Sequence, residues 1–298
     1  SRDELKQYEM ANDSFFAKYK KILRFFIGDV RDFNRLKFSM QEADYVIHAA
    51  ALKHVPAAEY NPFEVIKTNI IGSQNVIDSA IACKVKKVIA LSTDKAASPI
   101  NLYGATKLCS DKLFVGANNY TGKRDISFSI VRYGNVMGSR GSVIPKFIKM
   151  KKKNFITITD KRMTRFNITL SHGVEFVLRC FKDMLGGEIF VPKIPSYRIT
   201  DLAKSISPNI KIKIIGIRPG EKVHEEMITK SDAMNTIEFK NYFVILPNSQ
   251  FNIQKFKNYH IKKKGKKCKD NFSYSSEINK SFLSVNGLKK LLKNYIYK

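Results

Sequence analysis

The chain has 298 residues, of which 44% are hydrophobic, so it can bury a substantial core and intrinsic disorder is not expected. Lysine and arginine number 53 against 26 aspartates and glutamates, a formal net charge of +27. No nucleic-acid-binding motif accompanies this charge, so we interpret it as a solvated basic surface and do not expect nucleic acid as a partner. No apolar run approaches the roughly 18 residues that span a bilayer, which argues against membrane insertion.

The cysteines and histidines carry no pattern that is typical of a disulfide framework or a metal site. The chain has four cysteines without a C-x-x-C pair and five histidines without an H-E-x-x-H motif. We therefore predict no metal, and a reducing cytoplasmic location fits. The first residues lack the apolar core of a signal peptide and do not begin with Met, so we expect the chain to start inside a longer protein.

Short apolar runs alternate with stretches of helical periodicity along the chain. The periodicity predicts helices over residues 62–83 and 102–120. The apolar runs are predicted to be buried strands, and they lie at 22–27, 45–49, 85–92 and 126–133. Apolar strands that alternate with helices predict an α/β fold, a Rossmann-like doubly wound parallel sheet.

Small or polar residues follow each of the four predicted strands. Ligands of parallel sheets bind outside the carboxyl ends of the strands, so these four loops predict a cofactor crevice. However, no G-x-x-G-x-x-G loop precedes residue 100, although such a loop opens a dinucleotide-binding fold. Either the fold is a different one, or its first strand and helix are missing from this chain. The four loops favour the second interpretation.

Tyr103 and Lys107 are four residues apart on a predicted helix and therefore share a face. A free tyrosine has a pKa of about 10 and is a poor base at neutral pH, but a nearby ammonium lowers that pKa. Tyr103 is thus a candidate base for a substrate hydroxyl during hydride transfer. Such pairs also occur by chance on helix surfaces, but the position just after the strand that ends at Ser92 and Thr93 favours a catalytic role.

Asp94 and Lys95 form a second acid–base pair at the end of that strand. Alone, they would be interpreted as an exposed turn with a surface ion pair. Their place beside Tyr103 and Lys107 favours catalysis instead.

Several runs of residues resemble the extended short-chain dehydrogenase/reductases. Within that superfamily they are most similar to the UDP-N-acetylglucosamine 4,6-dehydratases that invert C5. The resemblance covers about residues 1 to 230 and only weakly the remainder. Its motifs are STDKAASPINLYGATK at 92–107, RYGNVMGSRGSVIP at 132–145, TDKRMTRF at 159–166, GEIFVPK at 187–193 and RPGEKVHEEM at 218–227.

The resemblance implies a reaction and a set of catalytic residues. Tyr103, assisted by Lys107, would take the proton of the sugar 4-hydroxyl while hydride passes from C4 to NADP. Lys95 would then remove the C5 proton, provided that burial and nearby cations keep it partly neutral. Asp94 would protonate the departing C6 hydroxyl, and hydride would return to C6. Thr93, at the same strand end, completes the expected catalytic set.

The resemblance also implies binding residues for NADP and for a UDP-sugar. The arginine among the first residues suits a 2′-phosphate, and two further arginines suit a diphosphate, although either of these two could instead form a structural ion pair. The expected cofactor residues are Ser1, Arg2, Asp29, Val30, Ala49, Ala50, Lys53 and Asn69, together with Tyr103 and Lys107. The expected substrate residues are Lys53, Asn135, Arg165, Arg218 and Glu221.

We expect three parts along the chain. Residues 1–142 would form a Rossmann-like NADP-binding domain without its first strand and helix. Residues 143–236 would form a smaller α/β substrate-binding region, partly interleaved with the first. Residues 237–298 would form a basic C-terminal segment. Similar enzymes form homo-oligomers, so we expect one here.

The expected product is a C5-inverted UDP-4-keto-6-deoxy-hexosamine for pseudaminic acid or other flagellar or capsular glycans. One alternative is a UDP-sugar 4-epimerase of the same superfamily, which shares Tyr103 and Lys107. An epimerase removes no proton at C5, so Asp94 and Lys95 argue against it. The other alternative is an inactive basic remnant.

Overall fold

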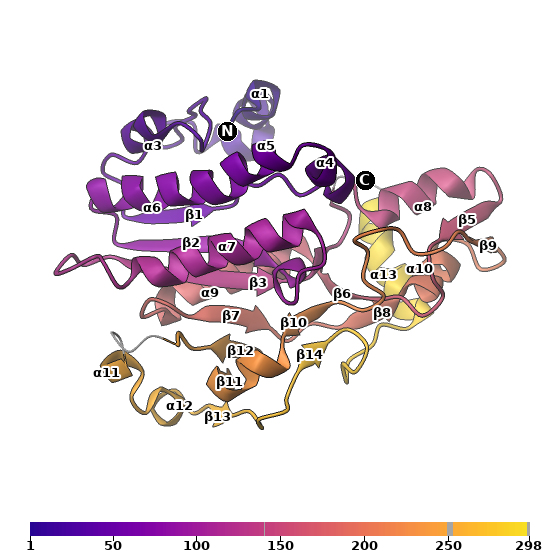
Figure 1. Ribbon diagram of the computed structural model, residues 1–298. Helices are drawn as coiled ribbons and strands as arrows, with labels where there is room; N and C mark the ends of the chain where they lie inside the picture. The colour runs from indigo at the N-terminus through magenta and orange to yellow at the C-terminus, as the bar shows by residue number, and fades with distance from the viewer. Residues whose placement is uncertain (140, 249–252, 297–298) are drawn as a thin grey trace.

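The computed structural model describes residues 1–139, 141–248 and 253–296. Residues 249–252 and 297–298 of the expected C-terminal segment lie outside the described residues. A central sheet with helices on both faces makes up most of the molecule. A smaller region lies beside it and is built around α8 (Val143–Lys151), α10 (Ile199–Ile206) and α13 (Val285–Ile296) (Figure 1).

The central sheet has seven strands in the order β1-β2-β3-β7-β12-β11-β13. The pairs from β1 to β7 are parallel, and the pairs beyond β7 are antiparallel. The predicted α/β class, the parallel core and the strands at 45–49, 85–92 and 126–133 are confirmed, whereas the antiparallel edge was not predicted. The strands are β1 (Tyr45–His48), β2 (Lys87–Thr93), β3 (Ser127–Tyr133), β7 (Ile189–Pro192), β12 (Tyr242–Ile245), β11 (Thr236–Glu238) and β13 (Lys266–Lys267).

Alternate residues of the parallel strands face opposite helical layers, as the two-residue period of a strand requires. Val88 and Ala90 of β2 pack with α6 and α7, whereas Ile89 packs with α9. This is why the strands are apolar throughout. The covering helices are α3 (Phe33–Ser39), α6 (Gly72–Ala82) and α7 (Leu102–Ala117) on one face and α9 (Leu170–Asp183) on the other (Figure 1).

The prediction of a strand over residues 22–27 is wrong. Ile22 lies in a turn and is 74% exposed, and residues 23–27 form no regular structure. Strand backbone needs a partner for its N–H and C=O groups. No strand among the described residues supplies these partners; Ser1 bonds to Phe26 and Gly28, and the side chains of Gln7 and Arg35 donate to the carbonyl oxygens of Phe26 and Ile27. Short helices surround this segment at α1 (Glu4–Asn12) and α2 (Ser14–Ala17).

The predicted helix over 62–83 is confirmed, with an irregularity in its middle. It consists of α5 (Pro62–Ile66), a π-helical turn (Lys67–Ile71) and α6, and it follows α4 (Val55–Tyr60). π-Turns inside helices often mark functional sites, because they displace one side chain from the regular spiral. Here the turn carries Asn69. No helix of the described residues combines the length and apolar character that a membrane span needs.

The smaller region has its own apolar core, which includes Phe147, Ile156, Leu202 and Leu288. The chain boundaries expected at residues 142 and 236 stay a prediction. Two elements pack outside the part in which they were expected: β7 joins the central sheet, and α13 packs in the smaller region. The remaining helices are α8 (Val143–Lys151), α10 (Ile199–Ile206), α11 (Ile253–Phe256), α12 (Tyr259–Lys262) and α13 (Val285–Ile296). The remaining strands are β4 (Asn135–Val136), β5 (Phe155–Ile158), β6 (Thr164–Ile168), β8 (Ser196–Arg198), β9 (Lys211–Ile214), β10 (Glu226–Ile228) and β14 (Tyr274–Ser275). Two 3-10 turns are η2 (Asp94–Ala96) and η3 (Lys230–Asn235).

A close approach between η2 and the start of α7 requires glycine at position 104. A Cβ there would clash with the carbonyl oxygen of Lys95 and lie 3.0 Å from Pro99 Cβ. We therefore expect Gly104→Ala to lower the free energy of unfolding by about 1–3 kcal/mol, as overpacking does. Urea unfolding followed by circular dichroism measures this.

Gly116→Ala is the matched control on the same helix. A Cβ at position 116 meets no atom within 4 Å, so this change should leave stability unchanged or raise it by up to about 1 kcal/mol, because alanine favours the helix. Equal effects of the two substitutions would contradict the packing argument.

Candidate active site

The loops after β1, β2 and β3 meet at one edge of the central sheet, as predicted from the parallel strand order. They line a cavity of about 410 Å³, together with the start of α7. The structure thus brings the expected catalytic residues together. Of the expected site residues, the lining of this cavity includes Lys53, Thr93, Asp94, Lys95, Tyr103, Lys107 and Asn135.

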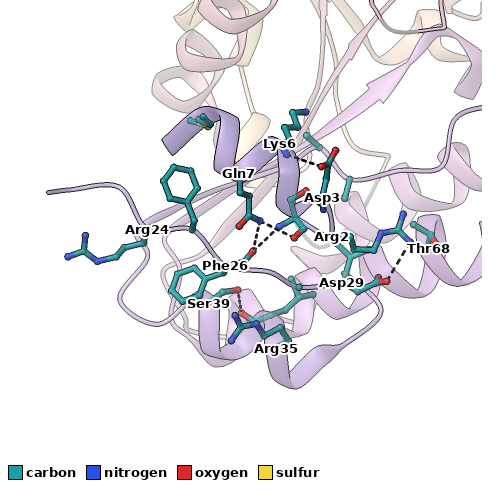
Figure 2. A pocket seen from close by; sticks show the side chains of 18 of the residues that line it. Arg2, Asp3, Lys6, Gln7, Arg24, Phe26, Asp29, Arg35, Ser39 and Thr68 are labelled. Atoms are coloured by element: carbon teal, nitrogen blue, oxygen red, sulfur yellow. Dashed lines mark hydrogen bonds and ion pairs between the residues drawn. The ribbon is translucent and has the colours of Figure 1, made fainter. Parts of the chain in front are cut away.

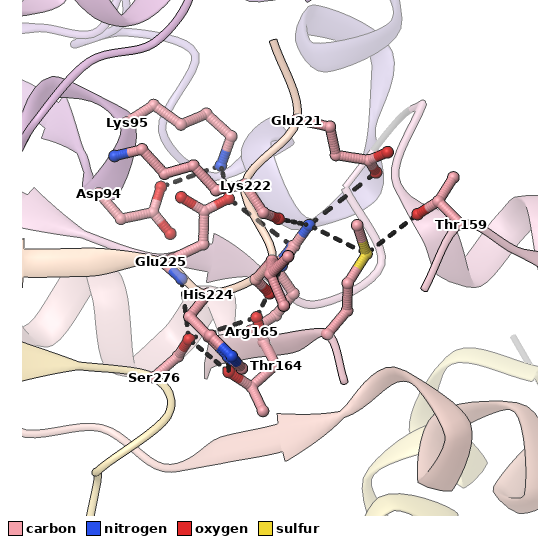
Figure 3. Close-up of polar contacts among 12 residues, drawn as sticks. Asp94, Lys95, Thr159, Thr164, Arg165, Glu221, Lys222, His224, Glu225 and Ser276 are labelled. Carbon is pink, nitrogen blue, oxygen red and sulfur yellow. Dashed lines mark hydrogen bonds and ion pairs between the residues drawn. The ribbon is translucent and has the colours of Figure 1, made fainter. Parts of the chain in front are cut away.

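Asp94 and Lys95 form a compact polar cluster with Glu225 at the end of β2 (Figure 3). Asp94 is completely buried, and its Oδ1 accepts hydrogen bonds from Thr93 Oγ1 at 2.9 Å and from Lys95 Nζ at 3.0 Å. Lys95 Nζ also lies 3.2 Å from Glu225 Oε1. The ammonium is therefore held between two carboxylates, of which the motif analysis assigned only Asp94.

The surroundings of Lys95 differ from those expected for a partly neutral lysine. Burial acts to lower the pKa of Lys95, but the carboxylates of Asp94 and Glu225 outweigh it and raise the pKa. Burial raises the pKa of Asp94, and Lys95 opposes this. In this arrangement Lys95 carries a proton, and Asp94 is a carboxyl group that takes up a proton more readily than an exposed one.

Tyr103 and Lys107 line the same cavity, but Lys107 does not act on Tyr103 as expected. Burial raises the pKa of Tyr103 to about 12, and Lys95 is the cation that opposes this. Lys107 Nζ donates to the carbonyl oxygen of Leu91 at 3.0 Å, and burial lowers the pKa of Lys107. The expectation of a depressed tyrosine pKa next to Lys107 is therefore not met in this arrangement.

A second cavity of about 730 Å³ adjoins the first, because Ala49 and Ala51 line both (Figure 2). Basic side chains line this cavity, among them Arg2, which lies 3.6 Å from Asp29. Tyr103 and Lys107 line the first cavity, so the two adjoining cavities connect these basic side chains to the predicted catalytic pair. The residues expected for the cofactor that line this second cavity are Ser1, Arg2, Asp29, Val30, Ala49 and Ala50.

Asn69 lines neither cavity but holds the loop that does, and only 1% of its surface is exposed. Its side chain donates to the Leu52 carbonyl at 2.9 Å and to Thr106 Oγ1 at 3.0 Å, and it accepts from the Leu52 N–H at 2.8 Å. The π-turn thus ties loop 49–53, which lines both cavities, to α7.

The two arginines expected at the diphosphate are engaged within the protein. Arg165 donates to the carbonyl oxygens of Thr164, Lys222 and Val223 at 2.7–2.9 Å. Arg218 pairs with Glu221 at 3.1 Å and remains 58% exposed. The alternative of structural ion pairs therefore describes the arrangement of both, and their contact with a substrate stays a prediction.

Sequence reasoning missed two residues of the site. Glu225 contacts Lys95, and Lys222 Nζ donates to the Ala97 carbonyl at 2.6 Å. Both belong to the run RPGEKVHEEM, in which only Arg218 and Glu221 were assigned. The sequence signal was the pair Glu225 and Glu226 in this run. The folding of this loop decides which of the two reaches Lys95, because Lys95 is far from it in the sequence.

Removing the Asn69 side chain should loosen loop 49–53. We expect Asn69→Ala to cost about 2 kcal/mol of unfolding free energy, because it leaves the Leu52 N–H and C=O without partners. Hydrogen exchange of the Leu52 amide should accelerate, and mass spectrometry measures it. Gln74→Ala serves as the control, because its side chain makes an exposed bond to Asp78. Unchanged exchange at Leu52 would show that the amide bonds do not hold the loop.

Comparisons with known proteins agree with this geometry. Residues 1–247 match the family model described as polysaccharide biosynthesis protein. The chain is 56% identical over 297 residues to the inverting UDP-N-acetylglucosamine 4,6-dehydratase of Campylobacter jejuni, covering 98% of this chain and 87% of that protein. It is 43% identical over 250 residues to a UDP-glucose 4-epimerase of Rickettsia bellii, covering 82% of this chain and 72% of that protein.

Among solved structures, Pen from Bacillus thuringiensis superposes with a TM-score of 0.86 at 38% identity, covering 98% of this chain and 88% of that chain. The match extends over both the central sheet and the smaller region. The chain therefore belongs to the polysaccharide biosynthesis protein family, and the resemblance of its motifs to the inverting UDP-N-acetylglucosamine 4,6-dehydratases is confirmed.

Proposed function

We propose that this protein is an inverting UDP-N-acetylglucosamine 4,6-dehydratase that uses NADP. The observation that carries the proposal is the cluster of Asp94, Lys95 and Glu225 beside Tyr103 in one cavity. The 56% identity to the Campylobacter jejuni enzyme supports the substrate and the stereochemistry. A role in flagellar or capsular glycan synthesis, assembly as a homo-oligomer and a cytoplasmic location stay predictions.

The chemistry divides between two pairs of side chains. Tyr103 must be a phenolate to accept the proton of the 4-hydroxyl, which turns it into a phenol, and the role that we propose for Lys107 is to favour that phenolate. The bound cofactor supplies a hydride acceptor and later a hydride donor, so it is unchanged overall. The 4-ketone acidifies the C5 proton, which Lys95 removes, and Asp94 protonates the C6 hydroxyl as it leaves as water. When hydride returns to C6, C5 would take up a proton on the opposite face, which inverts C5 and completes the 4-keto-6-deoxy product. Each acid–base step contributes about 10²–10⁴-fold.

The contact between Lys95 and Asp94 supplies both groups in the required protonation states. Lys95 must be neutral to act as a base, and Asp94 must be protonated to act as an acid. One proton that moves along the 3.0 Å hydrogen bond from Lys95 Nζ to Asp94 Oδ1 produces both states together. The raised pKa of Asp94, caused by its burial, favours this transfer, whereas the raised pKa of Lys95 opposes it, so we propose that the neutral amine forms only during turnover.

The residues of the two adjoining cavities fit NADP. The basic lining of the second cavity suits the phosphates of this cofactor, and Arg2 would hold the 2′-phosphate, since a guanidinium pairs well with phosphate oxygens. In the first cavity, Asp94 Oδ2 and Asn135 Oδ1 are buried without hydrogen-bond partners among the described residues, as atoms that face a ligand often are, and the sugar would bind there.

A UDP-sugar 4-epimerase is the second candidate function, which the Rickettsia bellii relative favours. It would use Tyr103 and Lys107 and leave C5 and C6 untouched. The buried acid–base cluster at Asp94 and Lys95 has no task in that reaction, so we rank the dehydratase first.

Incubation with UDP-N-acetylglucosamine and NADP in deuterium oxide tests the proposal. Proton NMR should show a 6-deoxy-4-keto sugar with deuterium at C5. A product that keeps its C6 hydroxyl and its C5 proton would instead establish the epimerase. Recovery of unchanged substrate together with DNA or RNA binding that falls steeply with salt would support the inactive basic remnant.

Substitutions should separate the two pairs. Tyr103→Phe should lower kcat by about 10²–10⁴-fold, because the hydroxyl proton loses its acceptor. Lys95→Met should abolish deuterium incorporation at C5 but leave the appearance of reduced cofactor, read at 340 nm in a single turnover. Lys112→Met, an exposed change on the same helix as Tyr103, should match the wild type. Loss of cofactor reduction in Lys95→Met would contradict the division of roles.

Arg2→Ala should weaken the binding of NADP and leave the binding of NAD nearly unchanged. Loss of a charged hydrogen bond costs about 1.5–3 kcal/mol, which corresponds to a Kd roughly 10- to 150-fold higher. Calorimetric titration with each cofactor measures the difference. Arg124→Ala, in a loop away from the cavities, is the control. Equal weakening toward both cofactors would place Arg2 away from the 2′-phosphate.

A further inference from the structure

We propose that Glu225 is a positioning residue for Lys95: it fixes the lysine amine at the end of β2 and sets the pH at which that amine becomes a base. The inference deepens the proposed function, because Lys95 is the group assigned to the C5 proton. Glu225 itself would touch neither the reacting atoms nor the cofactor.

Two buried contacts connect Glu225 to the site. Its side chain is 3% exposed, and its Oε1 lies 3.2 Å from Lys95 Nζ and 3.6 Å from Arg165 Nε. Its Oε2 has no hydrogen-bond partner among the described residues. A buried carboxylate is expensive unless it is paired, so the cations on either side are what keep Glu225 in place.

The backbone of Glu225 is held as firmly as its side chain (Figure 3). Its N–H donates to Ser276 Oγ at 2.9 Å, and its carbonyl accepts from the Ser276 N–H at 2.7 Å. Ser276 Oγ lies 2.7 Å from Thr164 Oγ1, which in turn lies 2.8 Å from His224 Nδ1. These bonds anchor the backbone of Glu225 to β6 and to the residue that follows β14, so Lys95 meets a fixed partner.

A fixed partner matters because a lysine amine sits on a flexible four-carbon chain. Asp94, the neighbour of Lys95 in sequence, supplies one restraint on the amine. Glu225 comes from a distant segment and supplies a second. Misplacement of a reacting group by about 1 Å can cost 10²-fold in rate, so the second restraint has a kinetic consequence.

Charged groups from several elements shift the pKa of Lys95. Nearby cations lower this pKa, and the carboxylate of Glu225 raises it. Burial alone would raise the pKa of Glu225, but Lys95, Arg165 and Lys222 outweigh it and hold that pKa below its ordinary value. Glu225 is therefore ionised, and it raises the pKa of Lys95. Without its charge, the Lys95 pKa falls. The other titratable or charged groups that act here are Asp94 on η2, Arg165 on β6, Lys222 in the preceding loop, Tyr103 on α7 and Tyr197 on β8.

A purely structural ion pair between Glu225 and Arg165 is the competing explanation. Such a pair would make Glu225 important for stability alone. Substitution would then shift the unfolding transition and leave the protonation of Lys95 unchanged. The pH dependence of Lys95 distinguishes the two explanations.

The first experiment measures the protonation of Lys95 without any turnover. Trace labelling with acetic anhydride at a series of pH values, followed by peptide mass spectrometry, gives the pH at which the amine becomes reactive; the side chain is 27% exposed. In Glu225→Gln this pH should fall by about one unit or more. Glu226→Gln is the matched control, because Glu226 bonds to Ser98 instead and should leave it unchanged.

The second experiment measures the rate of deuterium incorporation at C5 against pH. This rate rises as Lys95 loses its proton, so the rising limb in Glu225→Gln should move to lower pH. Its plateau should fall roughly 10- to 100-fold, because the amine loses one restraint. Glu225→Asp keeps the charge on a shorter arm, so its limb should stay near that of the wild type while its plateau falls.

The outcomes separate this proposal from the proposed function. If Glu225→Gln folds and its Lys95 amine becomes reactive at the same pH as in the wild type, the inference is overturned, whatever the protein catalyses. If that variant does not fold, Glu225→Asp decides, and a wild-type plateau would overturn the inference. Absence of C5 deuterium in the wild type would refute the dehydratase, while a shifted labelling pH would still support the effect of Glu225 on Lys95.

Discussion

The arrangement of this protein depends on one ammonium group held between two buried carboxylates at the end of β2. Lys95 Nζ lies 3.0 Å from Asp94 and 3.2 Å from Glu225. Charges buried in this way are tolerated only when each has a partner in good geometry, so the elements that supply the partners must be held rigidly. That requirement explains why the segment 218–225, which has no regular structure, is tied down by Arg165 and by Ser276.

The central sheet supplies the rigidity on the other side of the cluster. Three parallel strands end at the same edge and present their loops to one cavity, and β2 and β3 are buried along most of their length. Gly104 lets α7 approach η2 closely enough for Tyr103 to share that cavity with Lys95. Asn69, on a π-turn, ties the neighbouring loop to α7. Packing and hydrogen bonds far from the reacting atoms thus decide where the acid and the bases lie.

The same cluster gives a physical account of how one site holds an acid and a base at once. A lysine and a carboxyl group that share a proton can exchange it, which leaves both in the reactive state. Their third partner, Glu225, shifts the balance of that exchange by its charge. The chemistry therefore belongs to a coupled group of side chains, in which the protonation of each residue depends on its neighbours.

The sequence by itself determined the α/β class, three of the four strands at the ligand edge, the shared face of Tyr103 and Lys107, and the family. The first three of these follow from local periodicity and spacing, which one or two elements encode, and the family follows from the resemblance of whole motifs. Only the tertiary structure decided that residues 22–27 stay unpaired, that an antiparallel edge extends the sheet, that Arg165 serves the protein's own backbone and that Glu225 reaches Lys95. Pairing, burial and electrostatic balance depend on groups from distant parts of the chain, so no local pattern contains them.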